Sequence, residues 1–439
     1  MKKDIKDIDL TVTSLKLENG LEIYVIPKEN ANNTYATYTA RYGGLNNDFI
    51  PYNDNKIVSY PKGIAHFLEH KMFEQEDGND VFNFFSVRGS DANANTNNKK
   101  TTYLFSGPDN FYENLEFLLT YVESPYFTEE NVEKEKGIIE QEIMMYKDRP
   151  YSRILEGILY NGFINHPMKY PVIGTVKSIN SITVEDLYDC YNTFYHPSNM
   201  FLVVTGNVDP DNILKIVKDH EEKRKIIHAS PVELKEYDEP DEVFKDYEEI
   251  TMPITISKIS VGYKMNFSQI KGLKPYEIYY ILMNAFDLKV GSTSIFNEKL
   301  KDDELIVGEV SVGGLKTDRH VFIMVEAETK KPYEVIEKIK KEIKNLKITS
   351  VDLERRKKVT ISNLINMSDN IFKINDWLMN DLIEKKEVIY SPIDAVKRIN
   401  MDGVNKVLNK IDLTNITTFI INPENIAEWK LGEVIFHNF

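Results

Sequence analysis

The feature of the sequence that most limits its fold is a weak internal repeat. VKSIN at 176–180 recurs as VKRIN at 396–400, an offset of 220 residues (396 − 176 = 220). Two further pairs of segments match at nearly the same offset: FLVVTGNVDPDNI (201–213) with TTFIINPENI (417–426), and TEENVEKEKGIIEQEI (128–143) with TSVDLERRKKVTISNLI (349–365). A fixed offset near half the chain length predicts tandem duplication of one α/β unit.

The chain is also too long for one hydrophobic core. It has 439 residues, whereas single cores stop growing beyond about 250–300 residues. Residues 220–249 are dense in charge, contain Pro231 and Pro240, and show little periodic apolar pattern, which is typical of an interdomain linker. We therefore expect an N-terminal domain at 1–220, a charged linker at 221–249 and a homologous C-terminal domain at 250–439.

Hydrophobic periodicity predicts alternating strands and helices in the first half. The run 91–107 is rich in asparagine and is interpreted as an irregular entry into a strand. The remaining predictions are strands at 21–27, 36–42 and 201–208, and helices at 63–74, 79–87, 109–124 and 128–148.

Composition excludes several classes of protein. The formal net charge is −15 and the basic residues are scattered, which argues against nucleic-acid binding. No window approaches the roughly 18 apolar residues of a membrane-spanning helix, and no signal-peptide pattern begins the chain. The single cysteine, Cys190, cannot form an intrachain disulfide, which fits a reducing compartment. We expect a cytoplasmic protein with no membrane or nucleic-acid partner.

The stretch GIAHFLEHKMFEQE (63–76) carries the strongest chemical signal. On a helix, residues four apart share one face, so His66 and His70 would lie together with Glu69 at the edge of that face. Two neutral imidazoles suit Zn²⁺, and a neighbouring carboxylate that is not a ligand can act as general base. H-x-x-E-H is the zinc signature H-E-x-x-H in inverted order. A solvated helix face would explain one histidine, but not the pair together with the carboxylate.

Zinc needs a third protein ligand, for which VEKEKGIIEQEIMMY (132–146) offers candidates. Glu135 and Glu142 are seven residues apart, so they project from the same side of a helix. One of them could complete the site, and the other could orient a ligand. Spacing alone does not choose among Glu133, Glu135, Glu140 and Glu142.

The motifs HFLEH, NANTNNKKTTY (93–103) and EKGIIEQE (135–142) occur in the order found in the pitrilysin family. The chain resembles the half-length bacterial branch of these insulinase-like zinc metallopeptidases, which include insulin-degrading enzyme and the mitochondrial processing peptidase. The resemblance implies that His66, His70 and Glu142 bind Zn²⁺. It further implies that Glu69 is the catalytic base and that Glu135 is a supporting carboxylate at the catalytic centre.

The resemblance also implies a substrate-binding strand. The family's N-A-x-T…T-x-Y element matches Asn93, Ala94, Thr96, Thr101 and Tyr103. In the family this edge strand accepts an extended peptide by β-augmentation. We therefore expect the peptide to pair along Asn93, Ala94, Asn95 and Thr96.

From these features we expect an α+β fold of two tandem homologous domains, each a mainly antiparallel sheet with helices packed on one face. The predicted function is zinc-dependent endoproteolysis of short or unfolded peptides in a closed chamber. Two alternatives stay open: a dedicated maturase of one precursor peptide, and a non-catalytic scaffold subunit. The complete zinc set argues against the scaffold.

One departure from the family concerns the second domain, which usually carries an arginine and a tyrosine that bind substrate. In EKLKDDELIVGEVSVG (298–313), Lys301 stands in place of the arginine, and Val307 or Gly308 in place of the tyrosine. Lysine lacks the bidentate fork, and neither valine nor glycine offers a side-chain donor. We therefore expect the catalytic subunit of a heterodimer whose sister subunit supplies this pair, in preference to a homodimer.

Overall fold

The computed structural model describes residues 1–224 and 231–424, which form two compact units. Unit 1 comprises Met1–Met144, Tyr170–Tyr237 and Lys357–Arg398, and unit 2 comprises Met145–Lys169, Asp238–Arg356 and the chain from Ile399 onward. Each unit therefore contains a segment from the other half of the sequence. The predicted division into domains at 1–220 and 250–439, with a linker at 221–249, stays a prediction. Part of the predicted linker (225–230), the end of the repeat segment 417–426 and the C-terminal residues 425–439 lie outside the described residues.

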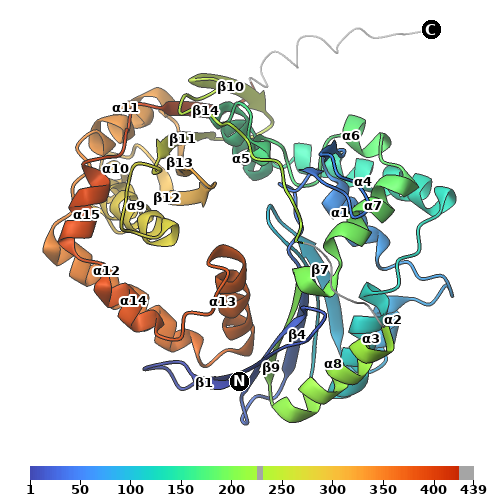
Figure 1. Cartoon of the computed structure of the whole chain (residues 1–439). Coiled ribbons are helices and arrows are strands. Elements are labelled where there is room, and N and C mark those ends of the chain that lie inside the picture. Colours follow the sequence, from blue (N-terminus) through green and yellow to red (C-terminus); the bar gives the residue numbers. More distant parts are fainter. Residues whose placement is uncertain (225–230, 425–439) are drawn as a thin grey trace, which may run out of the picture. The chain divides into compact units, whose positions relative to one another are not determined.

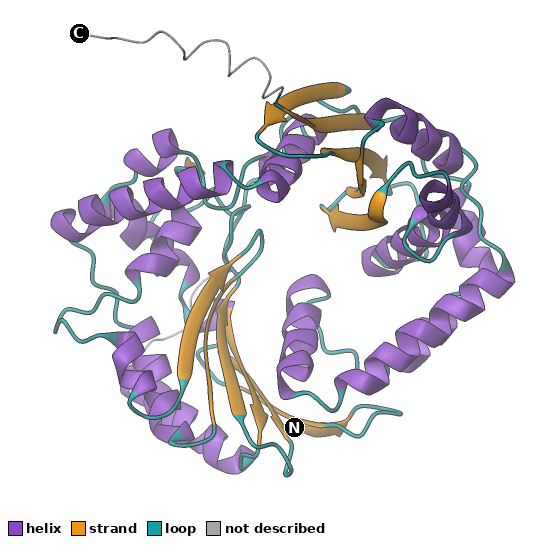
Figure 2. Ribbon diagram, turned by 180° about the vertical axis from the view of Figure 1, so that it is seen from behind, coloured by secondary structure: helices purple, strands orange, loops and turns teal. Residues whose placement is uncertain are grey.

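Unit 1 is built on a seven-stranded sheet in the order β1-β2-β3-β9-β4-β8-β7. Figure 2 draws the strands in orange and the helices in purple. Only β3 and β9 pair in parallel, and the other pairs are antiparallel. The strands are β1 (Lys2–Asp4), β2 (Thr11–Lys16), β3 (Glu22–Pro27), β4 (Thr34–Ala40), β7 (Asp91–Thr96), β8 (Thr101–Gly107) and β9 (Met200–Gly206).

Both faces of this sheet carry helices. Neighbouring residues of a strand point to opposite faces, and β4 shows where each face packs. Tyr38 donates a hydrogen bond of 2.9 Å to Glu123, directly after α3 (Phe111–Val122). Thr37 donates one of 2.7 Å to Asn375 on α13 (Ile371–Glu384), which lies along the opposite face (Figure 1).

Unit 2 is built on a five-stranded sheet in the order β10-β14-β11-β13-β12. Its strands are β10 (Tyr247–Met252), β11 (Ser257–Asn266), β12 (Val307–Lys316), β13 (His320–Thr329) and β14 (Ile416–Pro423). Val321 and Ile323 of β13 join the apolar core formed with α9 (Pro275–Val290) and α11 (Pro332–Ile343). Phe322 between them faces α5 (Pro150–Gly162) on the other side of the sheet.

The two sheets share one topology. The order β3-β9-β4-β8-β7 in unit 1 corresponds to β10-β14-β11-β13-β12 in unit 2, and each contains a single parallel pair at the same place. The extra helix is also equivalent, because α13 packs on β9 and β4 whereas α5 packs on β14 and β11. This correspondence is what tandem duplication predicts. The α+β class is therefore confirmed. Each sheet also carries a helix on its second face, α13 in unit 1 and α5 in unit 2, which the sequence did not predict.

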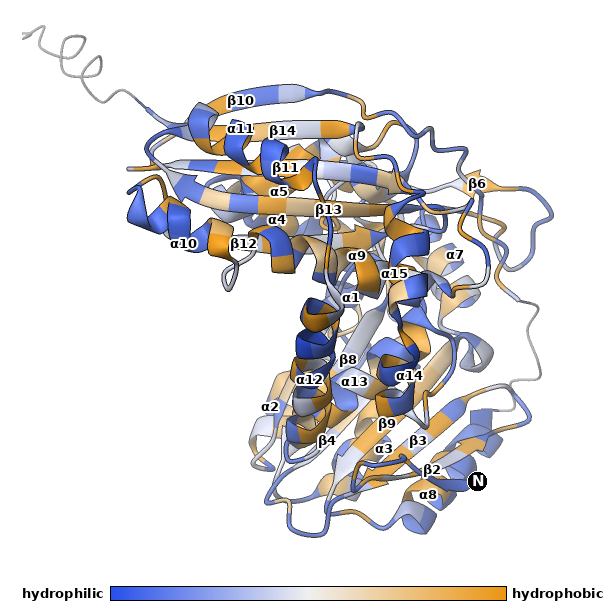
Figure 3. Ribbon diagram, turned by 90° about the vertical axis from the view of Figure 1, so that its left-hand side faces the viewer, coloured by the Kyte–Doolittle hydropathy of each residue, from blue (hydrophilic) through white to orange (hydrophobic). Residues whose placement is uncertain are grey.

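Figure 3 shows hydrophobic residues gathered on the central strands β3 and β9 of unit 1.

The other elements connect these layers. The remaining elements are α1 (Ile64–Lys71), α2 (Val81–Ser86), α4 (Glu129–Lys147), α6 (Val176–Asn180), α7 (Val184–Phe194), α8 (Pro210–Arg224), α10 (Ile295–Asp302), α12 (Ser350–Met367), α14 (Pro392–Arg398), α15 (Met401–Leu408), β5 (Asp48–Phe49), β6 (Val58–Ser59) and the short 3₁₀ turns Pro167–Lys169 and Pro197–Asn199.

The predicted irregular entry at 91–107 was wrong for its first part. Residues 91–96 form the regular strand β7, which pairs with β8 along its whole length. The asparagine signal belongs to the turn, where Asn97 Oδ1 accepts the backbone N–H groups of Lys99 and Lys100 at 2.8 and 3.0 Å. Pairing with β8 overrides the low strand propensity of the Asn-Ala run.

None of the helices within 1–224 and 231–424 combines the length and the apolar character that a bilayer-spanning segment needs.

The packing of α5 generates a test with a matched control. Alanine normally stabilises a helix interior relative to glycine by about 1 kcal/mol. A Cβ on Gly157 would lie 2.2 Å from the Phe419 ring, whereas one on Gly137 in α4 would meet nothing within 4 Å. Gly157→Ala should therefore lower the free energy of unfolding by about 1–3 kcal/mol, and Gly137→Ala should raise it. Denaturant unfolding followed by circular dichroism would show this; equal stabilisation by both would contradict the packing of α5.

Candidate metal centre

The helix that carries the histidines starts at a glycine. Gly63 precedes α1 with φ of 92°, a backbone conformation that favours glycine. A Cβ there would lie 2.5 Å from the carbonyl oxygen of Ile173, so a side chain would also be too close to that loop. The following eight residues form α1, and His66 and His70 emerge on one face of it, as predicted.

Unusually for a short helix, α1 buries charged residues together with its apolar ones. Phe67 and Leu68 are fully buried and anchor the helix in unit 1. Glu69 is only 8% exposed and Lys71 is not exposed at all. A solvated helix face would leave such side chains in water, so that interpretation does not describe α1.

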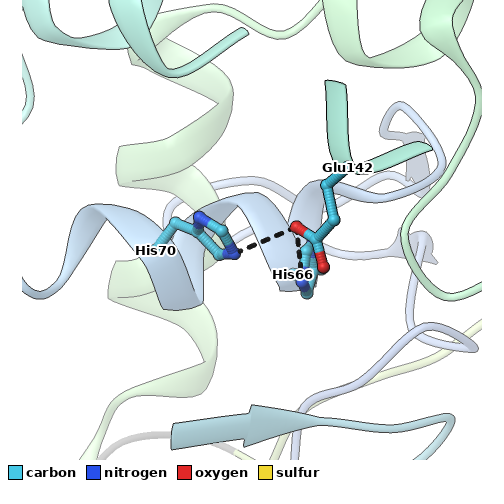
Figure 4. A group of neighbouring side chains, drawn as sticks. All are labelled: His66, His70 and Glu142. Carbon is cyan, nitrogen blue, oxygen red and sulfur yellow. Dashed lines mark ion pairs between the residues drawn. The ribbon is translucent and has the colours of Figure 1, made fainter. Parts of the chain in front are cut away.

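The helix α4 brings two glutamates to α1. Its first turn is closed by Thr128 and Asn131, whose side chains each accept the other's backbone N–H. Glu142 Oε2 lies 3.9 Å from His66 Nε2 and 3.6 Å from His70 Nε2 (Figure 4). Glu135 Oε1 lies 2.9 Å from His70 Nδ1, on the other side of that ring.

These contacts distinguish three of the four glutamates that the sequence left open. Glu142 shares the space between the two Nε2 atoms, and Glu135 binds the outer nitrogen of His70. Glu133 lies at the surface and pairs with Lys136 on the same helix at 2.5 Å. The geometry therefore brings the three predicted ligands together and places Glu135 beside His70; the roles of these residues stay predictions.

The donor set fits a zinc ion. Two ligand atoms about 2.1 Å from a tetrahedral ion are about 3.4 Å apart, close to the observed nitrogen–oxygen separations of 3.6 and 3.9 Å. His66, His70 and Glu142 offer donor atoms that all lie within 4.8 Å of one another. Histidine nitrogen and carboxylate oxygen are common zinc ligands, and three protein ligands are typical of catalytic sites.

Local electrostatics also favours a cation. Burial lowers the pKa of His66 to about 3, helped by the charge of His70, so its imidazole is neutral and able to bind metal. Burial would lower the pKa of His70 as well, but the hydrogen bond and charge of Glu135 and the charges of Glu69 and Glu142 outweigh it and raise this pKa. Three carboxylates thus converge on this pair of rings, an arrangement that a divalent cation stabilises.

A second group of potential ligands has a different character. Glu123, His220 and Glu221 also lie within ligand distance of one another. There, the Arg224 guanidinium lies 2.8 Å from Glu123 and 3.3 Å from Glu221. The arginine already supplies the positive charge, so this group is a buried ion-pair network between α3 and α8.

Glu69, the candidate base on α1, contacts the edge strand β7. Thr96 Oγ1 donates a hydrogen bond of 2.5 Å to Glu69 Oε2. Burial raises the pKa of Glu69, while that hydrogen bond and the charge of His70 lower it, and the net shift is upward. A raised pKa makes the carboxylate a stronger base at neutral pH.

The predicted substrate strand lies at an edge of the sheet. Asn93, Ala94 and Asn95 belong to β7, which pairs with β8 on one side and has no further strand beside it among the described residues. Such an edge can accept an extended chain. The substrate role of Asn93, Ala94, Asn95 and Thr96 stays a prediction.

Two features of the site were missed by sequence reasoning. The hydroxyl of Thr96 contacts Glu69, a role beyond pairing with a peptide. Lys71, directly after the motif, is fully buried against α4. The available signal was a lysine directly before the apolar pair Met72 and Phe73, since lysine is almost never fully buried without a partner.

The residues that depart from the family pattern lie in unit 2. Lys301 on α10 lies 3.2 Å from Glu309, so its ammonium is engaged there. Val307 opens β12 and is 52% exposed.

Comparisons with known proteins find similarity along most of the chain. The family model of insulinase (peptidase family M16) matches residues 58–176, and that of the peptidase M16 inactive domain matches residues 181–359. A Bacillus subtilis protein named "Uncharacterized zinc protease YmfH" is 35% identical over 93% of this chain and 95% of its own length. Zinc protease PqqE of Helicobacter pylori is 22% identical over 84% of each chain. An M16-like peptidase structure from Alicyclobacillus acidocaldarius superimposes with a TM-score of 0.89 at 28% identity, covering 96% of this chain and 100% of that one.

Substitutions on α4 test the arrangement directly. Glu142→Gln removes a charged donor, so zinc should no longer be retained through dialysis. Glu135→Gln should weaken zinc binding by about 10–100-fold, the usual effect of changing a partner that orients a ligand. Glu133→Gln, at the surface of the same helix, should bind zinc as the wild type does. Zinc content by atomic absorption distinguishes the three, and loss of zinc in Glu133→Gln would contradict the assignment.

Proposed function

Since the chain belongs to the M16, or insulinase-like, peptidase family, we propose that it is a zinc-dependent endopeptidase acting on short or unfolded peptides. One observation carries the proposal. Glu142 reaches both His66 and His70 across the α1–α4 contact, and the buried Glu69 lies beside them. A solely structural subunit would not need a buried base next to a metal site.

The chemistry divides between the metal and the chain. When bound, zinc would polarise the scissile carbonyl and lower the pKa of a water molecule. Glu69 would take the proton from the attacking water and return it to the leaving amine. Thr96 holds Glu69 Oε2 by its hydrogen bond and so fixes how the carboxylate is oriented. Glu135 holds the His70 ring at Nδ1 and thereby directs Nε2 toward the metal.

Substrate would add to the sheet as a further strand beside β7. Main-chain hydrogen bonds do not depend on side-chain identity, so this mode accepts varied sequences provided that the peptide is extended. Thr96 ends β7 and also contacts Glu69. A peptide paired along Asn93, Ala94 and Asn95 would therefore lead to the base.

The proposed assembly is a heterodimer. Lys301 is paired with Glu309, and Val307 offers no donor, so this chain would lack the substrate-clamping arginine and tyrosine. A homologous sister subunit would supply them and close a chamber around the peptide. We place this assembly in the cytoplasm, because the single cysteine, Cys190, is buried and not part of a disulfide.

The role of Glu69 is tested by Glu69→Gln. The amide cannot accept the proton, so peptide turnover should fall by about 10²–10⁴-fold. Zinc content should stay at the wild-type level, because Glu69 is not in the ligand set. A quenched-peptide library, assayed with and without chelator, measures turnover. Retained cleavage would overturn the assignment of the base.

The heterodimer is tested by producing the chain alone and together with a homologue that carries the arginine and tyrosine. Mass measurement in solution should show a one-to-one complex. Peptide turnover should rise by about 100-fold over the isolated chain, the usual effect of one oxyanion donor. Equal turnover with and without the homologue would contradict the proposed assembly.

A further inference from the structure

Lys71 is the most deeply buried charged side chain next to the candidate metal centre. Its side chain has no exposed surface, although it lies at the last position of a short helix. Lysine in such a position usually extends its ammonium into water. Here the side chain is instead enclosed by the protein, and its ammonium lies against α4.

The ammonium joins α1 to the first turn of α4. Lys71 Nζ donates to the backbone oxygen of Asn131 at 3.2 Å and to the carboxylate of Glu74. Asn131 also organises the start of α4, because its side chain accepts the N–H of Thr128 and donates to the carbonyl of Tyr126 at 3.1 Å. Lys71 thus binds α4 at a residue that, together with Thr128, closes its first turn.

Two neighbouring residues of α1 therefore contact α4 one helical turn apart. His70 meets Glu135, and Lys71 meets the carbonyl of Asn131, four residues earlier. A single contact would allow α4 to rotate about that point. Two contacts one turn apart along α4 fix both its distance from α1 and its direction. Glu142 lies about two turns beyond Glu135, so a small rotation at the start of α4 becomes a larger displacement at the ligand.

We propose that Lys71 is a positioning residue that sets the crossing of α1 and α4 so that Glu142 meets the two histidines. This inference rests on the zinc site proposed above and extends it. Lys71 would not touch metal or substrate.

The structure also indicates why this role differs from ordinary stabilisation. Glu74 is 41% exposed, so its carboxylate would stay hydrated without the lysine. The carbonyl of Asn131 lies inside α4, where the N–H of Glu135 is its helical partner. Removing the ammonium therefore leaves no buried group unsatisfied, and burial of a charge is costly in itself. A merely structural lysine would be replaceable here without effect on the metal.

The test compares Lys71→Met with Lys136→Met. Methionine keeps the length and apolar contacts of the lysine stem. Lys136 is a matched control, because its side chain is 11% exposed and pairs with Glu133 within α4, so it does not link the helices. Zinc affinity is measured by competition with a chromogenic chelator, and thermal unfolding is measured on the metal-free proteins. The absorption spectrum of the Co²⁺-substituted proteins reports ligand geometry.

We expect Lys71→Met to bind zinc about 10-fold more weakly than wild type, as changes beyond the ligands commonly do. Its Co²⁺ spectrum should change, while the metal-free unfolding temperature should match that of Lys136→Met. Lys136→Met should retain the wild-type affinity and spectrum. Unchanged affinity and spectrum in folded Lys71→Met would overturn the inference, as would an equal loss in Lys136→Met.

A second variant tests the same inference if Lys71→Met does not fold. Glu74→Gln retains an amide oxygen for Lys71 at a half-exposed position, so it should fold and lose affinity in the same direction by a smaller factor, about 3-fold. Wild-type affinity in folded Glu74→Gln would then overturn the inference. If the wild type bound no zinc, the proposed function would fail; if the wild type bound zinc and the variants matched it, only the role of Lys71 would fail.

Discussion

His70 stands between two carboxylates, with Glu135 at its Nδ1 and Glu142 near its Nε2. Both come from α4, so a single ring ties the two helices together and points its inner nitrogen at the shared space. His66 completes that space from the same face of α1, one turn earlier. A cluster of this kind holds several negative charges in a partly buried place, and a divalent cation would relieve their repulsion. The α1–α4 contact is therefore both the scaffold of the site and the reason that it favours a metal.

The two copies of the fold show how the site depends on a few residues. The segment beginning at Thr128 matches that beginning at Thr349, an offset of 221 (349 − 128 = 221), which places Arg356 opposite Glu135 (356 − 135 = 221). Arg356 on α12 pairs with Asp287 on α9. In unit 2 an ordinary ion pair thus joins the two helices at the position where unit 1 has carboxylate and histidine. The sheets keep one topology in both units, so the fold tolerates either arrangement and the chemistry lies in the helix pair.

Sequence patterns predicted the helices and strands around the site because their signals are local. The spacing of His66 and His70 determines one shared face on any helix, and the seven residues between Glu135 and Glu142 do the same for α4. The choice of Glu142 over Glu140 as ligand came from family resemblance, since spacing alone left it open. The strand β7 was misread because asparagine signals a turn locally, and only pairing with β8 made residues 91–96 regular. The packing of α5 and α13 on the sheet of the opposite half left no local signal at all.

By itself the sequence determined the repeat, the α+β class and the residue types able to bind zinc, because periodicity and motif spacing act over a few helical turns or strand residues. Tertiary structure alone decided which distant groups meet. It decided that Glu69 is buried. It also decided two contacts between distant segments: Thr96 bonds Glu69, 27 residues away, and Lys71 bonds Asn131, 60 residues away. Contacts of that kind depend on how helices and strands pack, and packing depends on the whole unit.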